Sequence, residues 1–277
     1  MIMRTIRSLP LLLLLLAACS PNNVRQDKTL GRFFTDHNAK GSFALMNNAT
    51  GRFTVYDLAR YRDSAYMPAS TFKILNALIG LQTGKIVNDS MVIPWDGVTR
   101  LRPEWNRDLT MYDAFRVSCV PYFQEVARRI GKDTMQHWLD SLKYGVQDAK
   151  SRVTITSPVD SFWLDNSLRV TPDQQLGLVK RLYFNQLPFF KSYQEMVKRA
   201  MLMENNTNYR MGYKTGSGHT PGGLPLGWVV GWIEENNHPY FFALTLELSD
   251  RLADPAGIPL KVLNGILGKL GFFKGNM

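Results

Sequence analysis

Cysteine and histidine are scarce in this chain of 277 residues, which has two cysteines and four histidines. Because Cys19 lies in an N-terminal segment that we expect to be processed, Cys119 is left without a disulfide partner. The histidines are scattered without zinc-ligand spacing, so we expect no metal site. The net charge of +10 is spread along the chain rather than gathered in basic runs, so we expect no nucleic-acid binding.

Long apolar runs are also missing outside the N-terminus. The run Leu9–Leu16 is shorter than the roughly 20 residues that a membrane-spanning helix needs. It follows Arg4 and Arg7 and precedes small residues, which is the anatomy of a secretory signal peptide. We therefore expect residues 1–18 to be removed.

The residues at the end of this segment, 16–19, read Leu-Ala-Ala-Cys and resemble a bacterial lipobox. The resemblance implies a lipid on Cys19 that anchors the chain to a membrane, and a periplasmic location in the bacterial cell envelope. The alternative is a plain signal peptide that contains a cysteine. Residues 19–28 are polar and are expected to form a tether.

Apolar residues alternate near both ends of the chain and recur with helical spacing in the middle. This order predicts an α+β fold over residues 29–277, in which an antiparallel sheet flanked by helices (29–65 and 204–277) receives an inserted all-helical lobe (66–203). A cleft between the two lobes is the expected ligand site. Strands are expected over 41–47, 52–58, 209–215, 228–234 and 240–248, and helices over 71–82, 122–130, 133–142, 172–184, 192–203 and 258–270.

Ser70-Thr71-Phe72-Lys73 is the first short pattern with chemical content. A serine and a lysine three residues apart share one face of a helix. A lysine that stays neutral can take the proton of the serine and make it a nucleophile. Such a pair also arises by chance, as a helix-capping serine and a solvent-facing lysine.

Two further patterns follow. Lys214-Thr215-Gly216 closes an expected strand; Lys214 can attract a carboxylate, and backbone N–H groups after Gly216, with that of Ser70, can form an oxyanion hole. Ser118-Cys119-Val120 precedes an apolar helix and offers a hydroxyl that can relay a proton. Taken alone, the first also fits a basic turn and the second a helix N-cap.

In this order the three patterns resemble those of serine enzymes that recognise penicillin. Over its mature length the chain resembles a class D (oxacillinase-type) β-lactamase. The resemblance implies the β-lactamase and penicillin-binding transpeptidase fold. It is carried by residues 68–73, 118–120, 162–164, 214–216 and 227–232.

The resemblance implies a two-step reaction with a small-molecule β-lactam. Ser70 attacks the lactam carbonyl, and water then hydrolyses the acyl-enzyme. The implied base is Lys73 carrying CO₂, from dissolved bicarbonate, as a carbamate; no dissociable cofactor is implied. Only a neutral amine reacts with CO₂, and burial lowers the pKa of a lysine. Ser118 is implied to pass a proton to the departing ring nitrogen.

The supporting residues are assigned by the same resemblance. Trp163 is expected to donate its indole N–H to the carbamate. The other walls of the carbamate pocket are Phe72, Val120 and Leu164, and the substrate is held by Lys214, Thr215, Gly216, Ser217 and Lys261.

Two departures from the family pattern stand out. Val146 replaces the usual asparagine after Tyr-Gly, so the loop beside Trp163 is expected to be held differently. Lys261 stands where an arginine often clamps the carboxylate, with Arg251 as the alternative.

Two related functions stay open. A β-lactam sensor acylates without turnover, and a D-Ala-D-Ala peptidase uses the same serine and lysine. Trp163 in its loop favours deacylation. The sequence predicts neither the substrate spectrum nor the oligomeric state.

Overall fold

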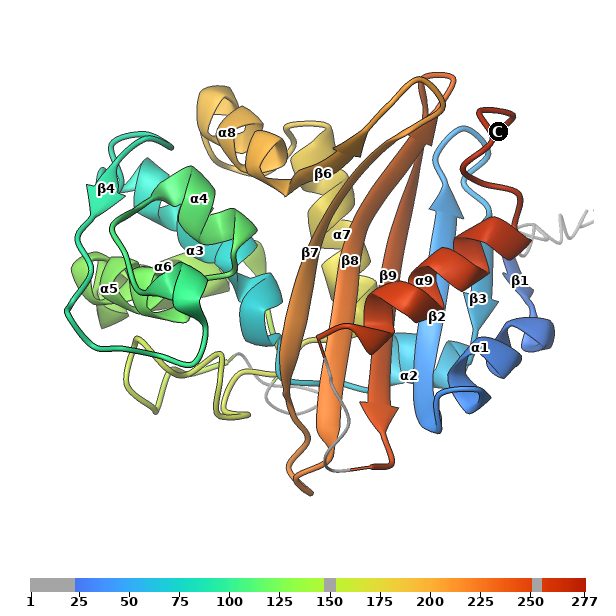
Figure 1. Cartoon of the computed structure of the whole chain (residues 1–277), viewed down its shortest axis with the longest axis horizontal. Helices are drawn as coiled ribbons and strands as arrows, with labels where there is room; N and C mark the ends of the chain where they lie inside the picture. Colours follow the sequence, from blue (N-terminus) through green and yellow to red (C-terminus); the bar gives the residue numbers. More distant parts are fainter. Residues whose placement is uncertain (1–22, 147–152, 251–255) are drawn as a thin grey trace, which may run out of the picture.

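A seven-stranded sheet forms the centre of the computed structural model, which describes residues 23–146, 153–250 and 256–277 (Figure 1). The expected signal peptide, Cys19 and Arg251 lie outside these residues and stay untested. The strand order is β1-β3-β2-β9-β8-β7-β6. The strands are β1 (Val24–Gln26), β2 (Ala39–Asn47), β3 (Phe53–Tyr56), β6 (Leu202–Asn205), β7 (Arg210–His219), β8 (Pro225–Glu235) and β9 (His238–Leu248).

The two ends of the chain meet in the middle of this sheet. Strand β2 pairs antiparallel with β9 along its whole length, from Ala39 opposite Leu248 to Asn47 opposite Tyr240. Since β2 comes early in the chain and β9 late, residues from the two ends of the chain form neighbouring strands. The prediction of a sheet built from both ends is confirmed.

The edge of the sheet differs from the prediction. Val24–Gln26 pairs parallel with β3, so the sheet is mixed rather than purely antiparallel. Asp27 extends the contact with β3, because its backbone N–H donates to the Val55 carbonyl. Its carboxylate accepts a hydrogen bond from the backbone N–H of Thr29. The second half of the expected tether is therefore packed against the domain.

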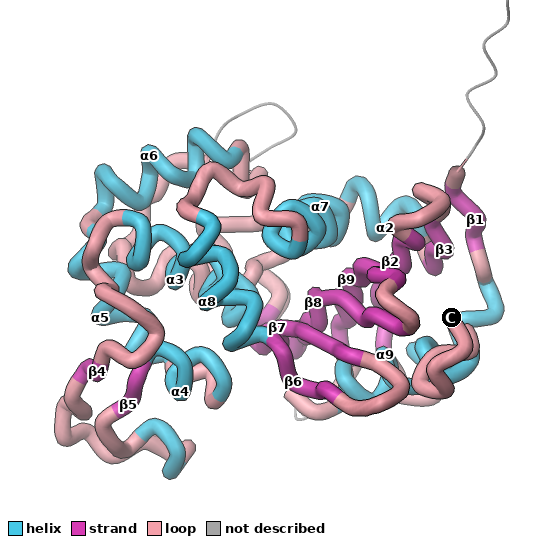
Figure 2. The backbone as a smooth tube through the Cα atoms, turned by 90° about the horizontal axis from the view of Figure 1, so that it is seen from above, coloured by secondary structure: helices cyan, strands magenta, loops and turns pink. Residues whose placement is uncertain are grey.

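Helices cover both faces of the sheet (Figure 2). Helix α9 (Ile258–Lys269) and the short α1 (Arg32–Thr35) lie on one face. Helices α7 (Pro172–Tyr183) and α2 (Leu58–Asp63) lie on the other. Helix α7 begins with a capping box in which Thr171 and Gln174 satisfy each other's backbone N–H groups.

The remaining helices form the second lobe beside β7 (Figure 1). The predicted all-helical lobe is wrong in two respects: α7 packs on the sheet, and the lobe contains a two-stranded ribbon. The elements of the lobe are α3 (Lys73–Gln82), α4 (Met111–Arg116), α5 (Val120–Ile130), α6 (Lys132–Leu142), α8 (Lys191–Met201) and the strands β4 (Val92–Ile93) and β5 (Leu109–Thr110).

Helix α3 is the centre of this lobe. Every residue from Lys73 to Leu81 is buried, because α5 and α8 pack against it. A helix that is buried on all sides packs stably only inside such a core. Its first turn therefore places the side chain of Lys73 inside the protein.

In the described part of the chain, every helix falls short of the length and apolarity that a bilayer span requires.

Candidate active site

Ser70 lies in a short 3-10 helix, η2 (Ala69–Phe72), that runs directly into α3. Ala69, just before it, has a φ of 49°, a left-handed conformation that is uncommon for a residue with a Cβ. Hydrogen bonds hold this turn, since Ala69 N–H donates to the Trp163 carbonyl at 3.1 Å and the Thr71 hydroxyl donates to the Pro68 carbonyl at 2.7 Å. Such conformations cluster at functional sites.

Lys73 is the hydrogen-bonding partner of Ser70. Its Nζ lies 2.6 Å from Ser70 Oγ, and its side chain is 0% exposed. Burial is the main cause that lowers its pKa well below the usual value, and the nearby Lys214 and Arg102 lower it further. Cys119 acts in the opposite direction. A pKa lowered in this way favours the neutral amine, whose lone pair can accept the proton of Ser70.

Among the described residues, no carboxylate forms an ion pair with the Lys73 amine. Instead, the Nζ lies 5.9 Å from the centre of the Phe123 ring on α5. The free energy of an unpaired buried charge is so unfavourable that the group neutralises instead. The apolar packing of the lobe thus sets the chemistry of Lys73.

A second serine–lysine pair faces the first. Lys214 on β7 donates to Ser118 Oγ at 2.8 Å and to the Thr215 carbonyl at 3.1 Å. Burial, with a smaller contribution from Arg102, lowers the pKa of Lys214 to about 7. Ser118, between α4 and α5, also has a left-handed φ of 55°.

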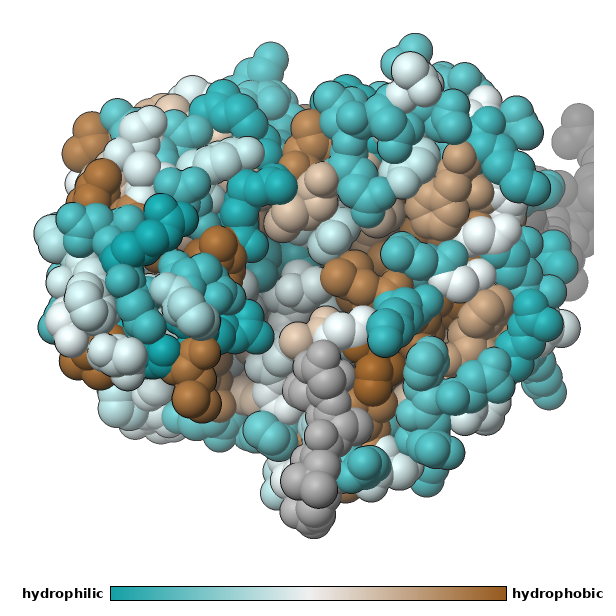
Figure 3. Space-filling model, viewed as in Figure 1, coloured by the Kyte–Doolittle hydropathy of each residue, from teal (hydrophilic) through white to brown (hydrophobic). Residues whose placement is uncertain are grey.

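Strand β7 passes close to the turn that carries Ser70. A Cβ on Gly216 would lie 2.9 Å from the Pro68 carbonyl oxygen, closer than real Cβ contacts allow. Only glycine lets the strand approach this far. Trp228 on β8 ties the same turn to the sheet by donating its indole N–H to the Met67 carbonyl at 2.9 Å. The Lys-Thr-Gly segment and the Ser70 turn therefore lie side by side. Figure 3 shows a hollow between the two lobes.

Trp163 is fully buried behind Phe72. The two rings stack with centroids 5.2 Å apart and planes inclined by 24°. Its indole N–H has no hydrogen-bond acceptor in this structure. A buried indole N–H normally has one, so this donor is available to an acceptor that the protein itself does not supply.

The structure brings together most of the predicted site residues. Ser70 and Lys73 form one pair, Ser118 and Lys214 another, and Phe72 stacks on Trp163. Thr215, Gly216 and Ser217 follow Lys214 along β7. Val120 and Leu164 are half-buried in the same lobe, and no recorded contact of the described residues joins either to Lys73.

Lys261 is not part of this cluster in the contacts of the described chain. It is an exposed residue of α9, which packs on the opposite face of the sheet from Trp163 and Phe72. The role implied for it stays a prediction.

A backbone hydrogen bond of Val146 holds the loop beside Trp163. The N–H of Val146 donates to the Arg169 carbonyl at 2.7 Å. This pairing uses the backbone alone and needs no polar side chain at position 146.

Several residues of the site were not predicted. Phe123 lies one turn after Val120 on α5, so helical spacing alone would have placed it on the same face. Phe115 lies on α4, and its ring centre is 5.7 Å from Lys214 Nζ. Arg102 precedes a short 3-10 helix and acts on the pKa of Lys214, a long-range relation that the sequence pattern does not show.

A buried polar chain behind Ser70 was missed too. Gln175 on α7 donates to the Thr71 hydroxyl at 2.6 Å and accepts from the Tyr144 hydroxyl at 3.3 Å. It fastens the Ser70 turn to the helix that covers the sheet. A single sequence cannot pair residues so distant in the chain.

Among the residues that the structure describes, no cluster of side chains fits a metal ion.

Comparison with known proteins agrees with this geometry. Residues 34–266 match the model of the penicillin binding protein transpeptidase domain. The β-lactamase OXA-11 of Pseudomonas aeruginosa is 35% identical over 272 residues, which cover 96% of this chain and 100% of that protein.

Two solved structures are similar over most of the chain. The class D β-lactamase YbXI from Nostoc aligns with a TM-score of 0.80 and 35% identity, covering 88% of this chain and 99% of that one. The C-terminal domain of the Bacillus licheniformis BlaR penicillin-receptor aligns with a TM-score of 0.82 and 31% identity, covering 90% and 97%.

The burial of Lys214 predicts a pH dependence of stability. Between pH 7 and 10.5 the unfolded chain binds a proton at this lysine that the folded chain does not, so the free energy of unfolding rises with pH across this window. Lys214→Met should flatten that rise by up to about 1.4 kcal/mol per pH unit. Urea unfolding at several pH values measures it.

The control is Lys261→Met, which removes an exposed lysine and should keep the wild-type slope. Equal slopes in wild type and Lys214→Met would show that this amine keeps its ordinary pKa in the folded state.

Proposed function

Because the chain belongs to the penicillin-binding transpeptidase domain family and, within it, is homologous to the class D β-lactamases, we propose that it hydrolyses β-lactam antibiotics through an acyl-enzyme on Ser70. The observation that carries the proposal is the 2.6 Å contact between Ser70 Oγ and the Nζ of a fully buried lysine. This contact activates a serine without histidine.

In the first step Ser70 Oγ bonds to the lactam carbonyl carbon and gives its proton to the base at Lys73. The carbon–nitrogen bond of the ring then breaks, and the ring nitrogen takes a proton from the Ser118 hydroxyl. Lys214 resupplies this proton, since its Nζ lies 2.8 Å from Ser118 Oγ. A pKa of about 7 suits a group that gives and regains a proton near neutral pH.

The residues around Lys73 fit a carboxylated lysine. Burial lowers the pKa of the amine and so favours the neutral form that reaction with CO₂ requires, and the Trp163 indole N–H lacks an acceptor. A carbamate on Lys73 would supply an anionic oxygen base for both steps. Lys73 would carry the group and Trp163 would donate a hydrogen bond to it.

Substrate recognition falls to β7. The Lys214 ammonium attracts the carboxylate of a β-lactam, while Thr215 adds a hydroxyl beside it. The close approach of Gly216 to the Ser70 turn brings the strand within reach of the lactam carbonyl.

A second function is supported by one observation, the similarity to the BlaR penicillin-receptor domain. A receptor of this kind acylates and keeps its acyl group. The unsatisfied indole of Trp163 favours hydrolysis, because it provides a holder for the base that deacylation needs.

Turnover distinguishes the two functions. With a chromogenic cephalosporin, the wild-type protein should convert many molecules per active site. Ser70→Ala should lower the rate by about a thousandfold or more, because the nucleophile is lost. A burst of one product per protein, with no further turnover, would contradict hydrolysis and support the receptor.

Trp163→Phe tests the base. The variant keeps the ring and removes the unsatisfied N–H, so deacylation should slow by roughly tenfold or more. Saturating bicarbonate should restore part of the rate by mass action. Rates are measured in buffers stripped of CO₂ and then supplemented.

The matched control is Trp138→Phe, at an indole that stacks on Phe189 away from the site. It should show wild-type rates at every bicarbonate concentration. If Trp163→Phe behaved like this control, its indole N–H would have no part in holding the base.

We also propose lipidation of Cys19 and a periplasmic location, supported by the residues of the lipobox. The full chain should sediment with membranes, and Cys19→Ala should release it. Sedimentation that is unchanged in the variant would contradict the anchor.

A further inference from the structure

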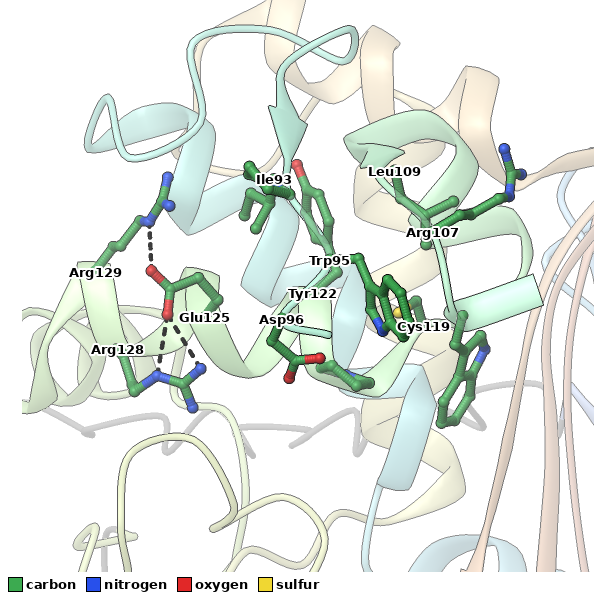
Figure 4. Close-up of a pocket in the computed structure, with 13 residues that line it drawn as sticks. Ile93, Trp95, Asp96, Arg107, Leu109, Cys119, Tyr122, Glu125, Arg128 and Arg129 are labelled. Atoms are coloured by element: carbon green, nitrogen blue, oxygen red, sulfur yellow. Dashed lines mark hydrogen bonds and ion pairs between the residues drawn. The ribbon is translucent and has the colours of Figure 1, made fainter. Parts of the chain in front are cut away.

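A pocket of about 230 Å³ lies in the helical lobe and does not include Ser70, Lys73 or Lys214 (Figure 4). It opens between the β4–β5 ribbon, the segment after β4 and the first turns of α5. Nothing in the proposed reaction uses it.

Aromatic and aliphatic side chains make up about half of its wall, and charged side chains supply much of the rest. Trp95, Trp105 and Tyr122 supply rings, and Ile93 and Leu109 supply aliphatic surface. An apolar protein cavity of about 150 Å³ is large enough to bind benzene. This pocket is larger and therefore has room for a planar molecule of two fused rings.

The charged residues at its rim already have partners. Glu125 pairs with Arg128 and Arg129 at 3.1 and 2.8 Å, as the dashed lines of Figure 4 show. Asp96 pairs with Arg100 at 2.6 Å. Arg107 points away from Trp95 and Tyr122 in the same view. The other charged residues of the lining are thus paired, and the aromatic side of the pocket suits an uncharged ligand.

Trp95 is placed to receive such a ligand. It is 37% exposed, although a tryptophan in a monomeric protein is usually covered for most of its surface. Its indole N–H is already used by the Val98 carbonyl at 3.0 Å, so its position is fixed. A flat molecule can stack on this ring with little loss of side-chain entropy.

The pocket also touches the chain on both sides of Ser118. Cys119, the next residue, lines it and is almost fully buried. Trp105 lines it as well, and its indole N–H donates to the carbonyl of Val117 at 3.0 Å. A molecule in the pocket therefore contacts the two residues that hold the left-handed turn at Ser118.

We propose that this pocket is a second ligand site, that it binds an uncharged bicyclic aromatic molecule, and that the bound ligand alters the proton relay at Ser118. The binding stands by itself, and the effect on the relay rests on the proposed hydrolysis. Ligand and β-lactam occupy the protein together, because Ser70 does not line the pocket.

Indole is the probe. Ligand-observed NMR with the full chain should show saturable binding with a dissociation constant of about 1 mM or lower. Binding should persist after Ser70 is acylated by a β-lactam. Loss of the signal on acylation would place indole in the substrate cleft and overturn the proposal, as would the absence of saturable binding.

Two variants change the pocket in opposite ways. Trp95→Ala removes an exposed wall and should weaken binding at least fivefold, while Ile93→Trp should fill the space and abolish it. Val87→Ala, at an exposed residue that does not line the pocket, is the matched control and should bind like wild type. Equal affinity in Trp95→Ala and the control, with both folded by circular dichroism, would rule the site out.

Kinetics test the coupling to Ser118. Indole should change kcat for cephalosporin hydrolysis in wild type and Val87→Ala, with little change in Trp95→Ala at the same concentration. Binding without any change in kcat would contradict the coupling alone. If the protein hydrolysed no β-lactam, the NMR titrations would still decide the binding.

Discussion

The removal of water from the Lys73 amine is the constraint on which the rest of the structure depends. A charged ammonium with no carboxylate beside it is strongly unfavourable in an apolar core, so the folded protein favours the neutral amine. That neutral form is the one able to take a proton from Ser70, 2.6 Å away. The stability lost by burying a lysine is thus the source of its reactivity, in keeping with the trade between stability and activity at functional sites.

Both lobes of the fold contribute to this environment. The helical lobe surrounds α3 and excludes water from Lys73, and the sheet brings Lys214 on β7 to the other side of the serine turn. Lys214 also lowers the tendency of Lys73 to be charged, since it is among the groups that depress the pKa of Lys73. Glycine at position 216 permits the contact between the lobes.

Much of this arrangement could be predicted from the sequence. The main helices and strands followed from apolar spacing, and the sheet joining both chain ends followed from their order. Ser70 and Lys73 were predicted as a pair because residues three apart share a helix face and because the order of the motifs resembles that of the class D β-lactamases. Gln175 and Arg102 were missed, since their contacts depend on segments far apart in the chain. The edge strand β1 was missed because its three residues are too short and polar to show a strand pattern.

Carbon-13 NMR of the protein in ¹³C-labelled bicarbonate tests the central claim most directly. If Lys73 is neutral and Trp163 donates to its carbamate as proposed, a carbamate resonance should appear near neutral pH and should be absent in Lys73→Ala. It should also weaken in Trp163→Phe. A spectrum with no carbamate signal at saturating bicarbonate, together with a Lys73 amine that titrates at the pKa of an ordinary lysine, would contradict the account.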